Sequence, residues 1–450
     1  MRHVIIGVGA AGISAARTIR ACDADADIVM ISEDQHVHSR CMLHHFMSGK
    51  KNEAGLNFAG ENFFKDNLIF WIQGESVDEI HEKEKELLLE SGQKIAYDKL
   101  LIATGANSFI PSVGNFREAK NVFGLRHLSD AQAICNMIDG KKVENRAESK
   151  AENKAESKAE NKENNVEKIS IENLQESIAT EVSEKRKVLV VGSGLVGLDA
   201  AYALLERGMD VTVVEMADRI LPIQLDDTGA QAYQKLFEKA GCRFFLGRKA
   251  SETVMNDKQE IEAVLLDDGT RIDCDLIIVA AGVRPALGCV ENSGIQHDRF
   301  IEVDEYMATS AEGIYAAGDV TGRAGIWPNA QKMGQIAGYN MCGLKMQYLD
   351  TYAMKNTINF FGLVTLSLGR GQVLEGDEVV VREDHSQYKK AIIRDGKLDS
   401  ITLQGDMDYS GIFQYLIKNQ IELPDNGKEI FDLSFADFYG IEADGQYSYQ

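Results

Sequence analysis

Residues 7–12 read Gly-Val-Gly-Ala-Ala-Gly, and residues 192–197 read Gly-Ser-Gly-Leu-Val-Gly. Both runs have the spacing G-x-G-x-x-G. In such a turn the first glycine permits a tight bend, the second lets a pyrophosphate approach the backbone, and the third allows a helix to pack closely on a strand. The chain therefore carries two candidate dinucleotide-binding turns, built on Gly7, Gly9 and Gly12 and on Gly192, Gly194 and Gly197.

The sequence around each turn has the context that such a turn requires. Apolar runs predict strands at 3–6 and 188–191, and Ala-rich runs predict helices at 10–19 and 195–206. The next strand of each unit should end in an acid that accepts the ribose hydroxyls, and Glu33 and Glu215 stand at these positions. Two complete units favour dinucleotide binding over ordinary glycine-rich turns.

The composition indicates a large, acidic protein. Its 450 residues are 44% hydrophobic, which is enough to form two or three cores. A net charge of -22 argues against nucleic acid and anionic membranes as partners, because both would repel the chain. No apolar run reaches the length of a membrane span, and the first predicted strand begins near residue 1 without a signal peptide. We therefore expect a cytoplasmic location.

Seven cysteines are spread along the chain without a C-x-x-C pair. This spacing suits neither a metal site nor a disulfide framework, and it is typical of a reducing compartment. We therefore predict no metal centre. Six of the cysteines should pack as small buried apolar residues, and Cys41 is the exception because of its surroundings.

Two more apolar strands should end in turns of small residues. One ends in Thr104 and Gly105, and the other in Gly318 and Asp319. The order of the four motifs resembles the FAD-dependent pyridine nucleotide-disulfide oxidoreductase superfamily over about residues 1–340. Within that superfamily, the chain is most similar to NADH-rubredoxin reductases and to the flavin part of nitrite reductases.

The resemblance implies an α/β fold with two nested Rossmann-like domains, one for FAD and one for NAD, and a C-terminal α+β domain. The FAD-binding domain would be discontinuous, at 1–113 and 284–344, and the NAD-binding domain would occupy 114–283. The C-terminal domain, 345–450, would form an interface or a docking surface for a partner. Within it, short strands and an amphipathic helix at 409–419 are predicted.

The resemblance also implies contacts with the cofactors. Asp319 would bond the ribitol or pyrophosphate of FAD, and Thr104 and Gly105 would lie along its adenine half. A helix over 326–343 would point its N-terminus at the flavin, with Trp327 either on the flavin edge or in the core. The implied cofactor-binding set also includes Arg40, Gly282, Gly318 and Ala330.

The acid of the second unit bears on the choice of nucleotide. A carboxylate at Glu215 would repel the extra phosphate of NADPH, and no arginine follows it immediately. We therefore expect NADH. Glu33 departs from the pattern of the superfamily, because many of its members place this acid where Ser32 stands.

The segment 38–49 departs from the disulfide reductases, because it lacks their C-x-x-x-x-C pair. The run Ser-Arg-Cys at 39–41 resembles the S-R-P run of rubredoxin and ferredoxin reductases, with cysteine in place of proline. The lone Cys41 also resembles the redox cysteine of coenzyme A-disulfide reductases and NADH oxidases. Cys41 is therefore either a redox thiol, activated where its basic neighbours lie close, or an inert residue. His45 stands where ferredoxin reductases place a lysine near the flavin, which implies proton transfer or tuning of the flavin.

Residues 147–162 repeat the unit Ala-Glu-Ser-Lys-Ala-Glu-Asn-Lys. The repeat has no large apolar side chain and cannot bury a core, and its like charges four residues apart weaken a helix. We predict a low-complexity surface insertion at 141–185 within the NAD-binding domain, with a tether for a partner as the alternative.

The sequence thus predicts an NADH-dependent FAD oxidoreductase in which hydride passes from nicotinamide to flavin between the two domains. The first candidate for the acceptor is a small electron carrier, rubredoxin-like or another iron-sulfur protein. The alternatives are reduction of a coenzyme A disulfide or persulfide through Cys41, reduction of oxygen, and an NADH-sensing role without rapid turnover. A homodimer or a partner subunit is compatible with each of them.

Overall fold

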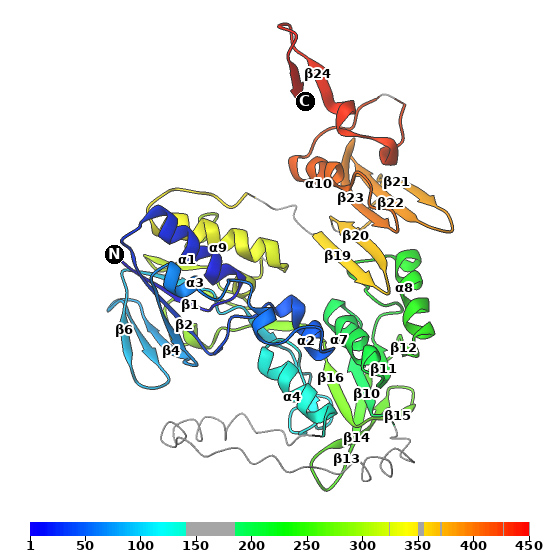
Figure 1. Cartoon of the computed structure of the whole chain (residues 1–450), viewed down its shortest axis with the longest axis horizontal. Coiled ribbons are helices and arrows are strands. Elements are labelled where there is room, and N and C mark those ends of the chain that lie inside the picture. The colour runs from blue at the N-terminus through cyan, green and yellow to red at the C-terminus, as the bar shows by residue number, and fades with distance from the viewer. Residues whose placement is uncertain (141–184, 324, 350–354, 370, 426, 450) are drawn as a thin grey trace, which may run out of the picture.

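Figure 1 shows the computed structural model, which describes residues 1–140, 185–323, 325–349, 355–369, 371–425 and 427–449. The chain forms two units built on parallel sheets and a third built on an antiparallel sheet. This arrangement confirms the predicted fold class. Residues 141–184 of the predicted insertion lie outside the described residues.

The first unit holds a parallel sheet in the order β18-β7-β1-β2-β3. Its strands are β1 (Arg2–Ile6), β2 (Asp27–Ser32), β3 (Ile69–Gln73), β7 (Lys99–Ile102) and β18 (Ile314–Ala316). The strands β1, β2 and β7 are mostly apolar and are buried except at their first residues, and α1 (Ala10–Cys22) and α9 (Trp327–Met341) lie side by side next to this sheet (Figure 1). The unit also contains β4 (Val77–His81), β5 (Glu86–Leu89), β6 (Lys94–Ala96), α2 (Leu43–Met47) and α3 (Phe63–Asp66).

The second unit repeats this plan in the order β12-β11-β10-β16-β9. Its strands are β9 (Val122–Phe123), β10 (Lys187–Val191), β11 (Asp210–Glu215), β12 (Arg243–Leu246) and β16 (Leu276–Val279). The helices are α4 (Leu128–Ile138), α7 (Leu195–Glu206) and α8 (Asp227–Lys239). A smaller antiparallel sheet consists of β13 (Ala250–Met255), β14 (Ile261–Leu266) and β15 (Arg271–Asp273).

The chain passes between the two units along one pair of antiparallel strands. It leaves the first unit through β8 (Ala106–Ser108) and returns through β17 (Val283–Pro285), which pairs with β8. The second unit is therefore inserted between β7 and β18 of the first. The exact borders at 113 and 284 stay a prediction.

The third unit packs against α8 of the second. Its sheet has the order β19-β20-β23-β22-β21, with β19 (Lys355–Phe360), β20 (Leu363–Leu368), β21 (Glu378–Glu383), β22 (Tyr388–Arg394) and β23 (Lys397–Gln404). Asp226 caps α8 and also accepts hydrogen bonds from Tyr388 and, at 2.8 Å, from Lys390. Helix α10 (Ser410–Asn419) lies close to its predicted place, and β24 (Tyr439–Ile441) and β25 (Tyr447–Tyr449) follow it.

Candidate active site

The first glycine-rich turn joins β1 to α1 and has two different kinds of glycine. Gly7 has φ 111°, and a Cβ there would collide with the carbonyl oxygen of Ala103. A Cβ on Gly12 would collide with the carbonyl oxygen of Gly7. A Cβ on Gly9, in contrast, would meet no atom within 4 Å. Gly7 and Gly12 are thus required by the fold, whereas Gly9 borders open space at the N-terminus of α1.

The second turn, between β10 and α7, has the same geometry. A Cβ on Gly192 would lie 2.5 Å from the carbonyl oxygen of Ala280, and Gly194 again borders open space. Glu215, at the end of β11, accepts hydrogen bonds from the backbone N (2.7 Å) and Oγ (2.9 Å) of Ser193. Glu215 is therefore held against the turn. Glu33, the corresponding acid of the first turn, is exposed.

Three elements of the first unit converge at Gly318. A Cβ on Gly318 would lie 3.2 Å from the Cβ of Ala11 on α1 and 3.8 Å from the Cβ of Ala330 on α9. The N-terminus of α9, which has a proline in its first turn, is therefore next to the first glycine-rich turn. Trp327 is half-buried and meets Phe58 edge to face, with ring centroids 4.6 Å apart.

Other predicted contacts lie at the crossing between the units. The hydroxyl of Thr104 donates to the carbonyl oxygen of Ala286 at 2.8 Å, so it ties the returning strand to the first unit. Gly105 and Gly282 have φ of 73° and 100°, and a Cβ on either would meet no atom within 4 Å. Both glycines therefore leave space at this crossing.

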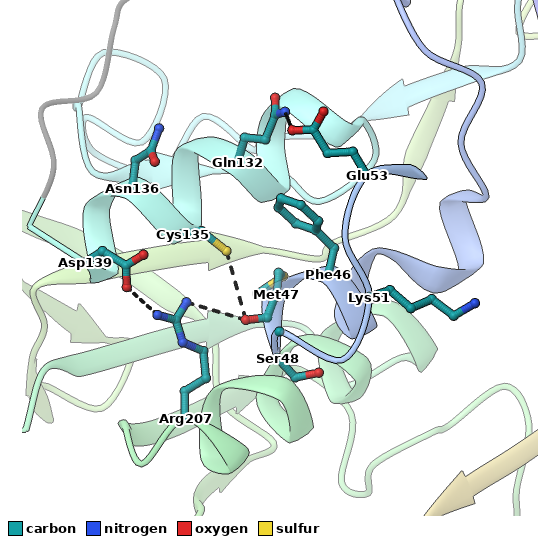
Figure 2. Close-up of a pocket in the computed structure, with 11 residues that line it drawn as sticks. Phe46, Met47, Ser48, Lys51, Glu53, Gln132, Cys135, Asn136, Asp139 and Arg207 are labelled. Atoms are coloured by element: carbon teal, nitrogen blue, oxygen red, sulfur yellow. Dashed lines mark hydrogen bonds and ion pairs between the residues drawn. The ribbon is translucent and has the colours of Figure 1, made fainter. Parts of the chain in front are cut away.

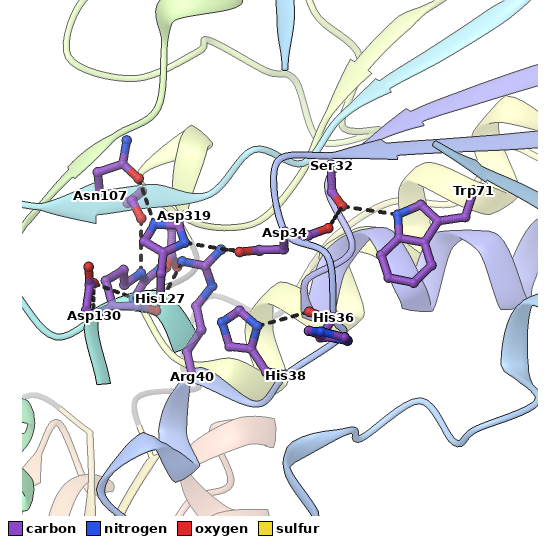
Figure 3. Close-up of polar contacts among 12 residues, drawn as sticks. Ser32, Asp34, His36, His38, Arg40, Trp71, Asn107, His127, Asp130 and Asp319 are labelled. Atoms are coloured by element: carbon purple, nitrogen blue, oxygen red, sulfur yellow. Dashed lines mark hydrogen bonds and ion pairs between the residues drawn. The ribbon is translucent and has the colours of Figure 1, made fainter. Parts of the chain in front are cut away.

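A chain of polar contacts begins at Asp319 (Figure 3). Asp319 forms an ion pair with Arg126, whose Nε donates to the carbonyl oxygen of Ala106 at 3.0 Å. Arg40 lies at the other end of the chain, with Nη1 3.5 Å from the carbonyl oxygen of Arg126 and Nη2 3.8 Å from Asp34. The structure thus brings the predicted residues Asp319 and Arg40 together through Arg126.

The chain of contacts continues through Asp34 to His127, whose Nδ1 lies 3.4 Å from the carboxylate (Figure 3). Burial opposes ionisation of Asp34, but the His127 hydrogen bond and Arg40 lower its pKa to about 2. Close by, His38 is buried with Nδ1 3.1 Å from the His36 carbonyl oxygen, and its Nε2 has no hydrogen-bond partner among the described residues.

These features together fit FAD. Open space at Gly9, a buried ring nitrogen on His38 and the cations Arg40 and Arg126 suit a ligand with a pyrophosphate and hydrogen-bonding rings. Sequence reasoning missed Asp34, His38, Arg126 and His127. No sequence motif pointed to His127, because the capping box at the start of α4, in which Asp130 accepts from the backbone of His127 at 2.9 Å, begins with a histidine instead of Ser, Thr, Asp or Asn.

The segment before α2 places Cys41 in a short 3-10 turn, Arg40–Met42. The residue is exposed, yet desolvation of its thiol and the carboxylate of Asp199 raise its pKa. Arg126 and Arg40 lower this pKa but are outweighed. The thiol is therefore mostly protonated at neutral pH, because Arg126 and Arg40 do not offset the effects of burial and Asp199.

His44 lies next to the second unit. Its Nδ1 is 3.7 Å from the carboxylate of Asp199 on α7, and the ring of His45 lies beside it, tilted by 42°, with the ring centroids 4.1 Å apart. Burial lowers the pKa of His44 to about 4 and raises that of Asp199 to about 7. His44 is thus neutral at neutral pH, and it supplies no positive charge to Cys41.

The rest of α2 is fixed between α4 and α7. A pocket of about 620 Å³ lies where the three helices meet (Figure 2), and none of the predicted site residues lines it. In this pocket Arg207 pairs with Asp139 and lies 3.4 Å from the carbonyl oxygen of Met47. Lys50 pairs with Glu206 on α7. These contacts hold Cys41 and His44 against the second unit.

The comparison with known families agrees with this geometry. Residues 1–334 match the family described as pyridine nucleotide-disulphide oxidoreductase, and residues 355–421 match the rubredoxin NAD+ reductase C-terminal domain. The chain belongs to the pyridine nucleotide-disulphide oxidoreductases. This membership confirms the predicted enzyme class and cofactors: an FAD-dependent oxidoreductase that uses NADH.

Three proteins illustrate what this oxidoreductase resembles. The NADH-dependent phenylglyoxylate dehydrogenase subunit epsilon of Aromatoleum evansii is 28% identical and covers 94% of this chain and 92% of its own length. An NADH oxidase of Methanocaldococcus jannaschii is 31% identical and covers 77% of this chain and 71% of its own. A chain in the crystal structure of the covalent putidaredoxin reductase-putidaredoxin complex has a TM-score of 0.76 over 94% of each chain at 21% identity, a likeness of fold alone.

The described part of this oxidoreductase has no group of three or more His, Cys, Asp or Glu side chains that could hold a metal ion. Among its described helices, none is both long and apolar enough to cross a bilayer.

Removing the carboxylate of Glu215 should weaken NADH binding. The carboxylate supports the turn at Ser193, and loss of hydrogen bonds to a charged group costs about 1.5–3 kcal/mol. We expect Glu215→Ala to raise the KM for NADH about tenfold to hundredfold. The preference of the enzyme for NADH over NADPH should become smaller. Steady-state kinetics with both nucleotides measure this. Asp218→Ala removes an exposed acid nearby and serves as the control, and equal effects in the two variants would argue against the role.

Neutralising Asp199 should make Cys41 more reactive. After burial, Asp199 makes the largest contribution to the raised pKa of the Cys41 thiol. We expect Asp199→Asn to speed alkylation of Cys41 by iodoacetamide about threefold to tenfold at mildly alkaline pH, because a lower pKa increases the thiolate fraction. Peptide mass spectrometry follows the rate. Asp218→Asn should leave it unchanged, and an unchanged rate in Asp199→Asn would contradict the assignment.

Proposed function

We propose that the enzyme transfers electrons from NADH through FAD to a small iron-sulfur carrier of the rubredoxin type. The observation that carries the proposal is the state of Cys41. Its thiol has a raised pKa, to which the carboxylate of Asp199 contributes, and no second cysteine lies in the segment 38–49. A protonated, unpaired thiol is poorly suited to disulfide exchange, so the electrons require another outlet.

The carboxyl-terminal unit and the relatives support the same acceptor. Residues 355–421 match a domain that is described for rubredoxin NAD+ reductase, and the structurally similar putidaredoxin reductase was solved in a covalent complex with putidaredoxin. Bound FAD would supply the chemistry that accepts a hydride from NADH and passes on single electrons, as a one-electron carrier requires. The third unit, packed on α8, would offer part of the docking surface.

We assign the binding roles as follows. The open backbone at Gly9 would receive the FAD pyrophosphate, and Arg40 and Arg126 would balance its charge together with that of Asp319. The open backbone at Gly194 would receive the NADH pyrophosphate, with Glu215 at the ribose. The N-terminus of α9 would favour negative charge on the adjacent ring, and the FAD-binding, NAD-binding and C-terminal domains would correspond to the three units.

The contacts around α2 suggest how the chain handles protons. His44 and Asp199 bridge the two units at 3.7 Å, so a proton on the Asp199 carboxyl would be held where the two nucleotides approach each other. His45 lies beside His44, with the ring centroids 4.1 Å apart, and is partly exposed, which would connect this proton to solvent. Trp327 and Phe58 would exclude water from the N-terminus of α9.

A second candidate function is reduction of a low-molecular-weight disulfide or persulfide, or of oxygen. It is favoured by the exposure of Cys41 and by its position between the two units, where Asp199 of the second unit and Asp319 of the first are both close enough to act on its pKa. The Cys41 thiol would become reactive if binding of the cofactors lowered its pKa. The similar protein from Methanocaldococcus jannaschii is named an NADH oxidase.

An anaerobic reductive titration of the purified enzyme tests the proposal. Uptake of about two electrons per FAD leaves the flavin as the one redox centre and supports a carrier protein as acceptor. Uptake of about four, with a long-wavelength thiolate-to-flavin band, would make Cys41 a second centre and overturn the proposal in favour of disulfide or persulfide reduction. Turnover with rubredoxin follows; slow reoxidation by every acceptor would indicate an NADH sensor instead.

A further inference from the structure

Helices α1 and α9 approach each other more closely than side chains normally allow. A Cβ on Gly334 would collide with the carbonyl oxygen of Ala11. One turn later, a Cβ on Gly338 would lie 3.0 Å from the carbonyl oxygen of Ala15 and 2.9 Å from the Cβ of Thr18. The contacts advance in the same direction along both helices, so the pair is parallel and in register.

The same register places Cys22 beside Cys342. Cys22 follows Thr18 by four residues at the end of α1, and Cys342 follows Gly338 by four residues at the end of α9. Cys22 is exposed and Cys342 half-buried, which corrects the expectation that both pack as buried apolar residues. Burial, followed by the adjacent Cys22 thiol, raises the pKa of Cys342 to about 11. Both thiols are free in the structure.

We propose that Cys22 and Cys342 form a redox-sensitive pair that closes to an intramolecular disulfide when the protein meets a low-molecular-weight disulfide such as oxidised glutathione. The reaction needs two thiols on adjacent backbones, one of them accessible, and the seam between α1 and α9 supplies both. This proposal is independent of the electron acceptor of the enzyme.

The exchange balances in two steps. The exposed Cys22, as thiolate, attacks the glutathione disulfide, forms a mixed disulfide and releases one glutathione thiolate. Cys342 then loses its proton and attacks the Cys22 sulfur, which releases the second glutathione as thiolate. The raised pKa of Cys342 slows this step, but its place on the adjacent helix makes the step intramolecular, an advantage that the lone Cys41 lacks. The two thiols lose two protons and two electrons, and the glutathione disulfide gains the electrons. The crosslink joins the C-terminal ends of the two helices whose N-termini border Gly9 and Gly318.

The test uses the full-length, flavin-loaded protein incubated with oxidised glutathione and then mapped by peptide mass spectrometry without reduction. We expect peptides that contain Cys22 and Cys342 to be joined, and the oxidised protein to unfold at a higher temperature than the reduced one. Glutathione left on Cys22 beside a free Cys342, or no reaction at either thiol, would overturn the proposal.

Three variants separate the pair from other cysteines. Cys342→Ser should retain glutathione on Cys22, because the resolving thiol is missing, and Cys22→Ser should prevent the crosslink. Neither should show the rise in unfolding temperature. Cys135→Ser, which changes another half-buried cysteine, should still form the crosslink. Comparison of the reduced variants by circular dichroism shows whether each is folded.

Discussion

Gly9→Ala should empty the flavin site while leaving the protein folded. The added methyl meets no protein atom within 4 Å, so the apoprotein has no reason to lose stability. The methyl would instead occupy the space through which a pyrophosphate approaches the N-terminus of α1. We expect FAD content to fall about tenfold or more. Even a partial loss of the contacts that the pyrophosphate makes with the N-terminus of α1 and the backbone of the turn costs more than about 1.4 kcal/mol. The ratio of flavin to protein absorbance measures the loss.

Gly12→Ala is the matched control, because it adds the same methyl one helical turn away. That methyl would collide with the backbone carbonyl of Gly7, so α1 must shift away from β1. Overpacking of this kind costs about 1–3 kcal/mol, and the unfolding temperature of the apoprotein should fall by several degrees. If Gly9→Ala instead kept its flavin while losing stability, the first turn would be a structural turn rather than a cofactor site.

The local pattern of the sequence predicted the glycine-rich turns well, because strand, turn, helix and acid follow one another within each unit. The same holds for the first turn of α9, where Pro328 marks the start of the helix. The fold class followed from these repeats. What they could not show is which glycine meets protein and which meets open space, since this depends on Ala103 and Ala280 from distant strands.

The polar contacts around Asp319 required tertiary information. Arg126 and Asp319 are far apart in sequence, and neither belongs to a motif that names the other. The same reason explains why the sequence could not show which of His44 and His45 meets Asp199. Position relative to Cys41 favours both histidines, and only the packing of α2 against α7 shows that His44 meets Asp199. The raised pKa of Cys41 likewise depends on Asp199, which lies on another unit.

Cys41→Ser should separate the two proposed electron outlets. Serine keeps the size and exposure of the residue but cannot form a disulfide, so any reduction of coenzyme A disulfide should fall about 100-fold or more. Reduction of a rubredoxin-type carrier should stay within about threefold of the wild-type rate, because that route uses the flavin alone. Both rates are measured with NADH under anaerobic conditions, and Cys135→Ser provides the control for loss of a thiol elsewhere.

The pattern of the two rates decides between structural and chemical explanations. An equal loss of both activities in Cys41→Ser would mean that the Cys41 side chain only positions its own turn, Arg40–Met42. The assignment of disulfide reduction to Cys41 and of carrier reduction to the flavin alone would then be wrong. Loss of disulfide reduction alone would establish a thiol route despite the raised pKa, and would require binding of the cofactors to lower that pKa. If the variant keeps the wild-type rate with the carrier, and if the wild-type enzyme hardly reduces disulfides, Cys41 takes no part in the chemistry. The effect of Asp199 on the pKa of Cys41 favours this outcome.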